Sequence, residues 1–160
     1  MPQIPAEILA QLLPRAAAWV EAQERFMLGN NESRVLNPQG QEIARRAGVA
    51  RPELVKILAV PVIPSPEEAD LREAALAFGL ITAGTAGLTL GYGIFVRQDF
   101  VNNPKLIAHE LKHVAQYERA GSILGFLQAY LVECNQFGYP AAPMELEAVA
   151  FAEQVFPNQR

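Results

Sequence analysis

The sequence has little of several features that would place it in a common class of protein. Its one cysteine, Cys134, excludes an intramolecular disulfide and a multi-cysteine zinc cluster. Lysine and arginine number 13 against 17 aspartates and glutamates, and the formal net charge of -4 argues against a general nucleic-acid binder. Only 19% of the residues are charged and 51% are hydrophobic, which excludes a disordered chain.

Targeting and membrane signals are also missing. The first residues lack the basic region and apolar run of a signal peptide, so we expect a cytoplasmic protein. The uncharged stretch 74–96 is long enough to cross a bilayer. Its five glycines weaken a helix, however, and its alternating apolar residues favour two strands joined through 91–93. We therefore predict no membrane span.

The rest of the sequence predicts helices, then a small sheet, then helices again. Helices are expected over 6–28, 38–48, 66–78, 104–119, 122–134 and 143–155, and strands over 54–62, 88–90 and 94–96. Asn37, Ser65 and Asn103 each precede a proline and are typical helix caps. Pro14 should kink or split the first helix. This order predicts one α+β domain, mostly helical, with a small sheet of about three strands.

The most specific motif is His109-Glu110-Leu111-Lys112-His113. The chain has only two histidines, and both lie here, four residues apart. On a helix this spacing puts both rings on one face, where they can reach one zinc ion. Glu110, beside the first histidine, can accept a proton from a water on that zinc. This is the HExxH pattern of zinc proteases.

A catalytic zinc commonly has three protein ligands and one open position. Because the chain has no third histidine, the third ligand should be Cys134 or a carboxylate downstream of the motif. Glu118 lies on the same helix but points away from His113. The sequence leaves Glu133, Glu145 and Glu147 as candidates.

Helical periodicity favours Glu145 over Glu147. Glu145 shares a small, apolar face with Ala148, Val149, Ala152 and Phe156. Such a face can press against the HExxH helix and bring Glu145 to the metal. The face of Glu147, with Ala150, Phe151 and Gln154, looks more exposed.

Residues 108–116 resemble the active helix of gluzincin metallopeptidases. The segment 145–148, followed by Phe151 and Ala152, is similar to the second-motif helix of the ImmA/IrrE-like and related small gluzincins. The resemblance covers roughly residues 86–155 and implies a zinc-dependent metallopeptidase in which Glu145 is the third ligand. It also implies that 88–97 form a strand pair whose edge strand aligns a peptide substrate. Residues 51–160 would then be the catalytic core, and 1–50 a helical extension.

The resemblance has departures. Many gluzincins carry Asp or Asn four residues after the ligand glutamate, to orient a zinc-bound histidine, and this chain has Val149 there. Another group must then orient the histidine. The metzincin pattern is excluded, because Gln116 and Arg119 stand where its glycine and third histidine would be.

Hydrolysis also needs a hydrogen-bond donor for the oxyanion that forms on the substrate. Tyr139, in a loop shortly before Glu145, is the first choice. Tyr130 is a second candidate and Tyr117 a weaker one.

Two other interpretations stay open at this stage. Residues 41–50 resemble the first part of a helix-turn-helix. This suggests, as an alternative, a non-catalytic regulatory or interaction protein with a structural or degenerate zinc site, for which 41–56 would be the DNA-binding segment. Pro52 and the strand-like run 54–62 weigh against that interpretation. Residues 1–60 could instead cover the cleft of a latent enzyme.

Overall fold

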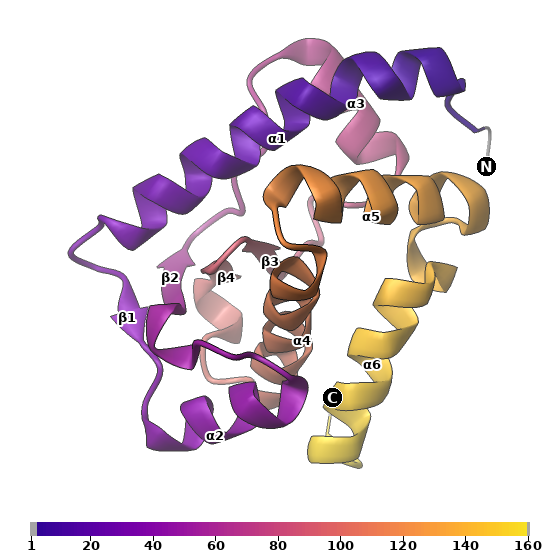
Figure 1. Ribbon diagram of the computed structural model, residues 1–160. Coiled ribbons are helices and arrows are strands. Elements are labelled where there is room, and N and C mark those ends of the chain that lie inside the picture. Colours follow the sequence, from indigo (N-terminus) through magenta and orange to yellow (C-terminus); the bar gives the residue numbers. More distant parts are fainter. Residues whose placement is uncertain (1–2, 160) are drawn as a thin grey trace.

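The computed structural model describes residues 3–159, and within them six α-helices and a four-stranded mixed sheet (Figure 1). The helices are α1 (Ala6–Leu28), α2 (Pro38–Ala47), α3 (Ala69–Ala77), α4 (Pro104–Ala120), α5 (Ile123–Phe137) and α6 (Pro143–Val155). The strands are β1 (Arg34–Val35), β2 (Lys56–Val60), β3 (Gly87–Leu90) and β4 (Gly93–Arg97). Short 3-10 turns cover Pro52–Leu54, Gln98–Phe100 and Tyr139–Ala141. The α+β prediction is confirmed.

The strand order is β1-β2-β4-β3, with β2 parallel to β4 and the other pairs antiparallel. The predicted hairpin is present: Leu88 pairs with Phe95, and Gly91 turns the chain at φ +69°. The small sheet has four strands, where the sequence predicts about three. The additional strand, β1, has two exposed residues and is too short to show an alternating pattern.

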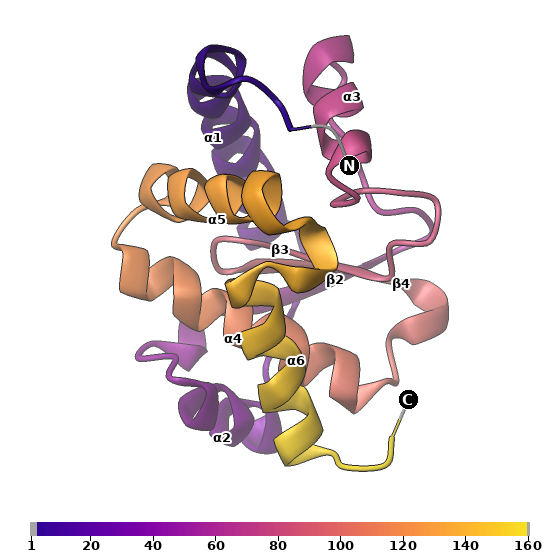
Figure 2. The ribbon, with the colours of Figure 1, turned by 90° about the vertical axis from the view of Figure 1, so that its right-hand side faces the viewer.

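The sheet lies between helices on both faces. In Figure 2 the strands cross the middle of the molecule, with α1 and α3 above them and α2, α4 and α6 below. Strand β4 is buried on both faces, since Phe95 packs in one apolar cluster with Met27 of α1, and Ile94 packs in another with Leu111 of α4. This double burial explains the continuous apolar run in its sequence.

Two of the three predicted asparagine and serine caps are present. The Asn37 side chain accepts a hydrogen bond from the backbone of Gly40, and Asn103 accepts one from Leu106. The prediction for Ser65 is wrong, because α3 begins three residues after Pro66, at Ala69, with Glu68 at its N-cap. Arg15 of α1 bonds the carboxylates of Glu68 and Asp70 there.

Pro14 does not split the first helix, because α1 continues through it as one element. No helix within residues 3–159 is long and apolar enough to span a membrane. Residues 74–96 instead contain the end of α3, a loop and the β3–β4 hairpin.

The segment suggested as a helix-turn-helix contains only one helix. After α2 the chain forms a 3-10 turn at Pro52–Leu54 and then enters β2. Residues 41–56 therefore supply no second helix to act as a recognition helix.

Helix α6 packs closely on α4, because the contact is made by small residues: Ala108 on α4 and Ala148 and Ala152 on α6 are buried. Part of the predicted face of α6 is wrong. Val149 is 52% exposed, whereas Phe151, assigned to the exposed face, is buried. The close approach of these two helices brings the first turn of α6 to the HExxH segment.

Candidate metal centre

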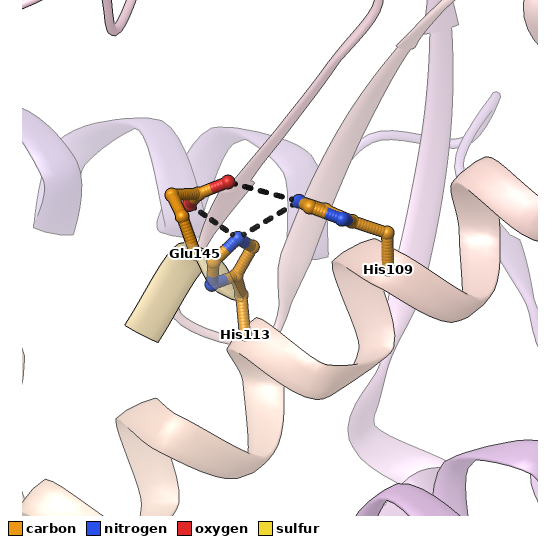
Figure 3. Close-up of side chains that lie close together, drawn as sticks. All are labelled: His109, His113 and Glu145. Atoms are coloured by element: carbon orange, nitrogen blue, oxygen red, sulfur yellow. Dashed lines mark hydrogen bonds and ion pairs between the residues drawn. The ribbon is translucent and has the colours of Figure 1, made fainter. Parts of the chain in front are cut away.

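Three side chains from two helices converge on one point. His109 and His113 lie one turn apart on α4, and Glu145 lies in the first turn of α6 (Figure 3). His109 Nε2 is 3.1 Å from Glu145 Oε1 and 3.2 Å from His113 Nε2, and His113 Nε2 is 2.8 Å from Glu145 Oε2. Among the residues that the structure describes, this is the only group of three such side chains close enough to hold a metal ion.

The donor atoms fit a small tetrahedral ion. Two ligands at about 2.0–2.1 Å from a tetrahedral zinc lie about 3.3 Å apart. The 3.2 Å and 3.1 Å separations from His109 Nε2 approach that spacing. Two imidazoles and one carboxylate are also a common ligand set of catalytic zinc, which keeps its fourth position for water or substrate. This buried His-His-Glu group could therefore hold a metal ion.

His113 and Glu145 each stabilise the charged form of the other. Burial alone would lower the pKa of His113, but the hydrogen bond and the charge of Glu145 outweigh it and raise that pKa to about 9. Burial likewise acts to raise the pKa of Glu145, and the hydrogen bonds from His109 and His113 outweigh it, so that this pKa lies well below its usual range. The carboxylate is therefore ionised and attracts a cation to the two rings.

Gln116 fixes the orientation of His113. Its Nε2 lies 3.0 Å from the Met144 carbonyl and 2.8 Å from Glu147 Oε1, which are both acceptors. The amide group must point its NH₂ at those oxygens, so Oε1 faces His113 Nδ1 at 2.7 Å and accepts its proton. His113 Nε2 is then directed at the site, as a metal ligand requires.

Glu110 is buried beside the triad. Its Oε1 is 2.8 Å from the hydroxyl of Thr89 on β3, which donates to it, and its Oε2 is 4.0 Å from His109 Nε2. Gly87 gives it room: a Cβ there would lie 3.2 Å from Cγ and Oε2 of Glu110. The edge strand β3 thus holds this carboxylate next to the three candidate ligands.

Two of the three tyrosines considered for the oxyanion reach the triad. The Tyr130 hydroxyl donates to Glu145 Oε2 at 2.6 Å. Burial and the Glu145 carboxylate raise the pKa of both Tyr130 and Tyr139, so both hydroxyls keep their protons. Tyr117 stacks on Phe126, with the ring centroids 3.7 Å apart.

The other third-ligand candidates lie elsewhere. Glu118 accepts hydrogen bonds from the backbone of Ala50 and from the Tyr92 hydroxyl. Glu133 accepts one from the backbone of Met144, and Glu147 bonds Gln116 and Arg119. Cys134 is buried, and burial raises the pKa of its thiol to about 12.

The triad borders open space. A groove of about 490 Å³ runs past His109, Glu110 and Tyr139, between the loop before β3 and the start of α4. A metal ion held by the triad would thus have a free approach on this side. A closed structural site has no such access.

Three residues that shape the site were not assigned a role from the sequence. Gln116 had a local signal, because it lies three residues after His113 on the same helical face. No local signal in the sequence pointed to Thr89 or Gly87, because they contact Glu110 only where β3 packs on α4.

Comparisons of this chain with family models, with curated proteins and with solved structures found no match.

Proposed function

We propose that this protein is a zinc-dependent metallopeptidase. The observation that carries the proposal is that the only two histidines of the chain converge with Glu145, beside the buried carboxylate of Glu110 and next to a groove. The resemblance of 108–116 and 145–152 to the gluzincins supports the same conclusion. His109, His113 and Glu145 are the proposed zinc ligands.

Zinc bound there would lower the pKa of a coordinated water toward neutral and polarise a peptide carbonyl. Glu110 accepts the proton of the attacking water and passes it to the leaving amine. Thr89 and Gly87 hold the Glu110 carboxylate in place for this transfer. Tyr139 borders the groove and is the proposed donor to the oxyanion. Tyr130 instead keeps Glu145 oriented.

The substrate is proposed to be an extended peptide. Strand β3 is at the end of the described sheet order and pairs only with β4. Its other edge is available to a peptide strand, which is the arrangement used in β-augmentation. Gly87 of this strand lines the groove together with His109 and Glu110.

The test combines metal content with turnover. Protein purified without chelator should contain about one zinc per chain by elemental mass spectrometry, and His113→Ala should lose it. Glu110→Gln should keep the zinc and lose hydrolysis of a proteome-derived peptide library, read by mass spectrometry. Glu42→Gln, on the exposed surface of α2, is the matched control and should cleave normally. Undiminished cleavage by Glu110→Gln would refute the mechanism, and zinc without cleavage would favour a regulatory protein.

A further inference from the structure

A second cavity, separate from the groove, also adjoins the triad. It has a volume of about 130 Å³ and lies between α1, α3, α5 and β3. Its walls are formed mainly by apolar side chains, among them Leu12, Trp19, Leu71, Phe78 and Leu131. Ala16 of α1 and Ala75 of α3 leave the space open between the larger side chains.

The cavity and the groove meet at the metal site. Gly87, His109, Glu110 and Tyr139 line both. A peptide lying in the groove with its carbonyl at the metal would thus have the opening of the cavity beside the bond to be cut. At about 130 Å³ the cavity is close in size to a cavity of about 150 Å³ that binds benzene.

We infer that this cavity receives a large apolar side chain of the substrate, aromatic or long aliphatic, next to the scissile bond. The inference rests on the proposed function, because the metal site defines which bond is cut. Part of the cavity wall comes from α1 and α3, so these helices are part of the specificity site. Away from the metal site the apolar walls offer a charged side chain no partner, so the cavity disfavours one.

The test uses two zinc-binding hydroxamates that differ in their apolar tail. Acetohydroxamic acid has no tail, and 4-phenylbutanohydroxamic acid carries a phenyl group on a flexible chain. The zinc-loaded protein should bind the second at least about tenfold more tightly, because its tail buries apolar surface. Trp19, the only tryptophan of the chain, lines the cavity, so its fluorescence should change with the phenyl compound and not with acetohydroxamate.

Variants separate the cavity from the metal site. Ala75→Phe fills the cavity and should abolish the difference in affinity while leaving acetohydroxamate binding unchanged. Ala77→Phe, exposed on the same helix, is the matched control and should keep the difference. If Ala75→Phe does not fold, Ala16→Leu replaces it, with Ala18→Leu on the exposed side of α1 as its control.

The outcomes are distinguishable. A protein that takes up no zinc would refute the proposed function, and the substrate class with it. Zinc uptake with equal affinity for the two hydroxamates, or a preference that Ala75→Phe and Ala16→Leu leave intact, would overturn the cavity assignment and leave the metal site standing.

Discussion

His113 donates its Nδ1 proton to Oε1 of Gln116 over 2.7 Å, and both residues lie on the same helix, three positions apart. The other end of the Gln116 amide reaches the Met144 carbonyl, at the start of α6. One side chain therefore orients a candidate ligand and ties together the two helices that carry the triad. Gln116 thus supplies the polar group that orients the histidine. Val149, at the position where such a group was expected, is apolar and 52% exposed.

Gln116→Ala should lower the zinc affinity about 10- to 100-fold, as expected when a partner that orients a metal-bound histidine is removed. His113 would lose the acceptor that fixes its ring and its tautomer. The affinity is measured by competition with a fluorescent chelator. Gln128→Ala, exposed on α5, is the control. An affinity equal to that of the unmodified protein would show that Gln116 does not orient the ligand.

Gly87→Ala should reduce hydrolysis between about tenfold and a hundredfold while zinc stays bound. The new Cβ would lie 3.2 Å from Glu110 Cγ and Oε2, so the carboxylate must shift, and small misplacements of a catalytic group are costly. The rate and the zinc content are measured on the same sample. Gly29→Ala, at the end of α1, should be silent, because its Cβ would have the Arg25 carbonyl oxygen at 3.4 Å as its nearest neighbour and Gly29 lines neither the groove nor the cavity. Full activity in Gly87→Ala would show either that Glu110 takes no part in the mechanism or that β3 moves to make room for the new Cβ.

Glu118→Ala should lower the free energy of unfolding by about 1 to 2 kcal/mol and leave zinc binding unchanged. The Glu118 carboxylate accepts hydrogen bonds from the backbone of Ala50 and Arg51 and from the Tyr92 hydroxyl, and the variant removes this shared acceptor. Denaturant unfolding measures the loss, with Glu42→Ala as the surface control. A loss of zinc would instead show that Glu118 belongs to the metal site.

Local signals in the sequence predicted the helices of the site well. Asn103 and Pro104 mark the start of α4, and Pro143 marks the start of α6, because capping and proline geometry act within a few residues. Periodicity favoured Glu145, and the structure places it against the histidines. The same argument failed for Val149 and Phe151, because the tilt of α6 on α4 depends on small residues of both helices.

Contacts made through the sheet were beyond the reach of the sequence. Thr89 bonds Glu110 only because the register of the hairpin turns its side chain toward α4. The apolar cavity is likewise formed by α1, α3 and α5, whose residues lie far apart along the chain. Each of these helices has an apolar pattern that predicts burial but does not say what it is buried against.

Removing the metal should make the stability of the protein depend on pH. Without a metal, Glu145 raises the pKa of His113 to about 9, above its ordinary value of 6.5. The protonated ring then stabilises the fold fully below about pH 6.5, and this contribution, at most about 3 kcal/mol, is lost as the pH rises toward 9. Glu145 itself stays ionised over this range, because its pKa is lowered.

Zinc requires the neutral ring, so its binding should release the His113 proton and tighten as the pH rises toward 9. Denaturant unfolding at pH 6, 7.5 and 9, with chelator or with excess zinc, measures both effects. The chelated protein should become less stable with rising pH, and the added stability from zinc should grow. The matched variant His113→Gln lacks the titrating ring, so its stability with chelator should stay flat over this range. A flat profile for the unmodified chelated protein would show that His113 and Glu145 do not form this ion pair.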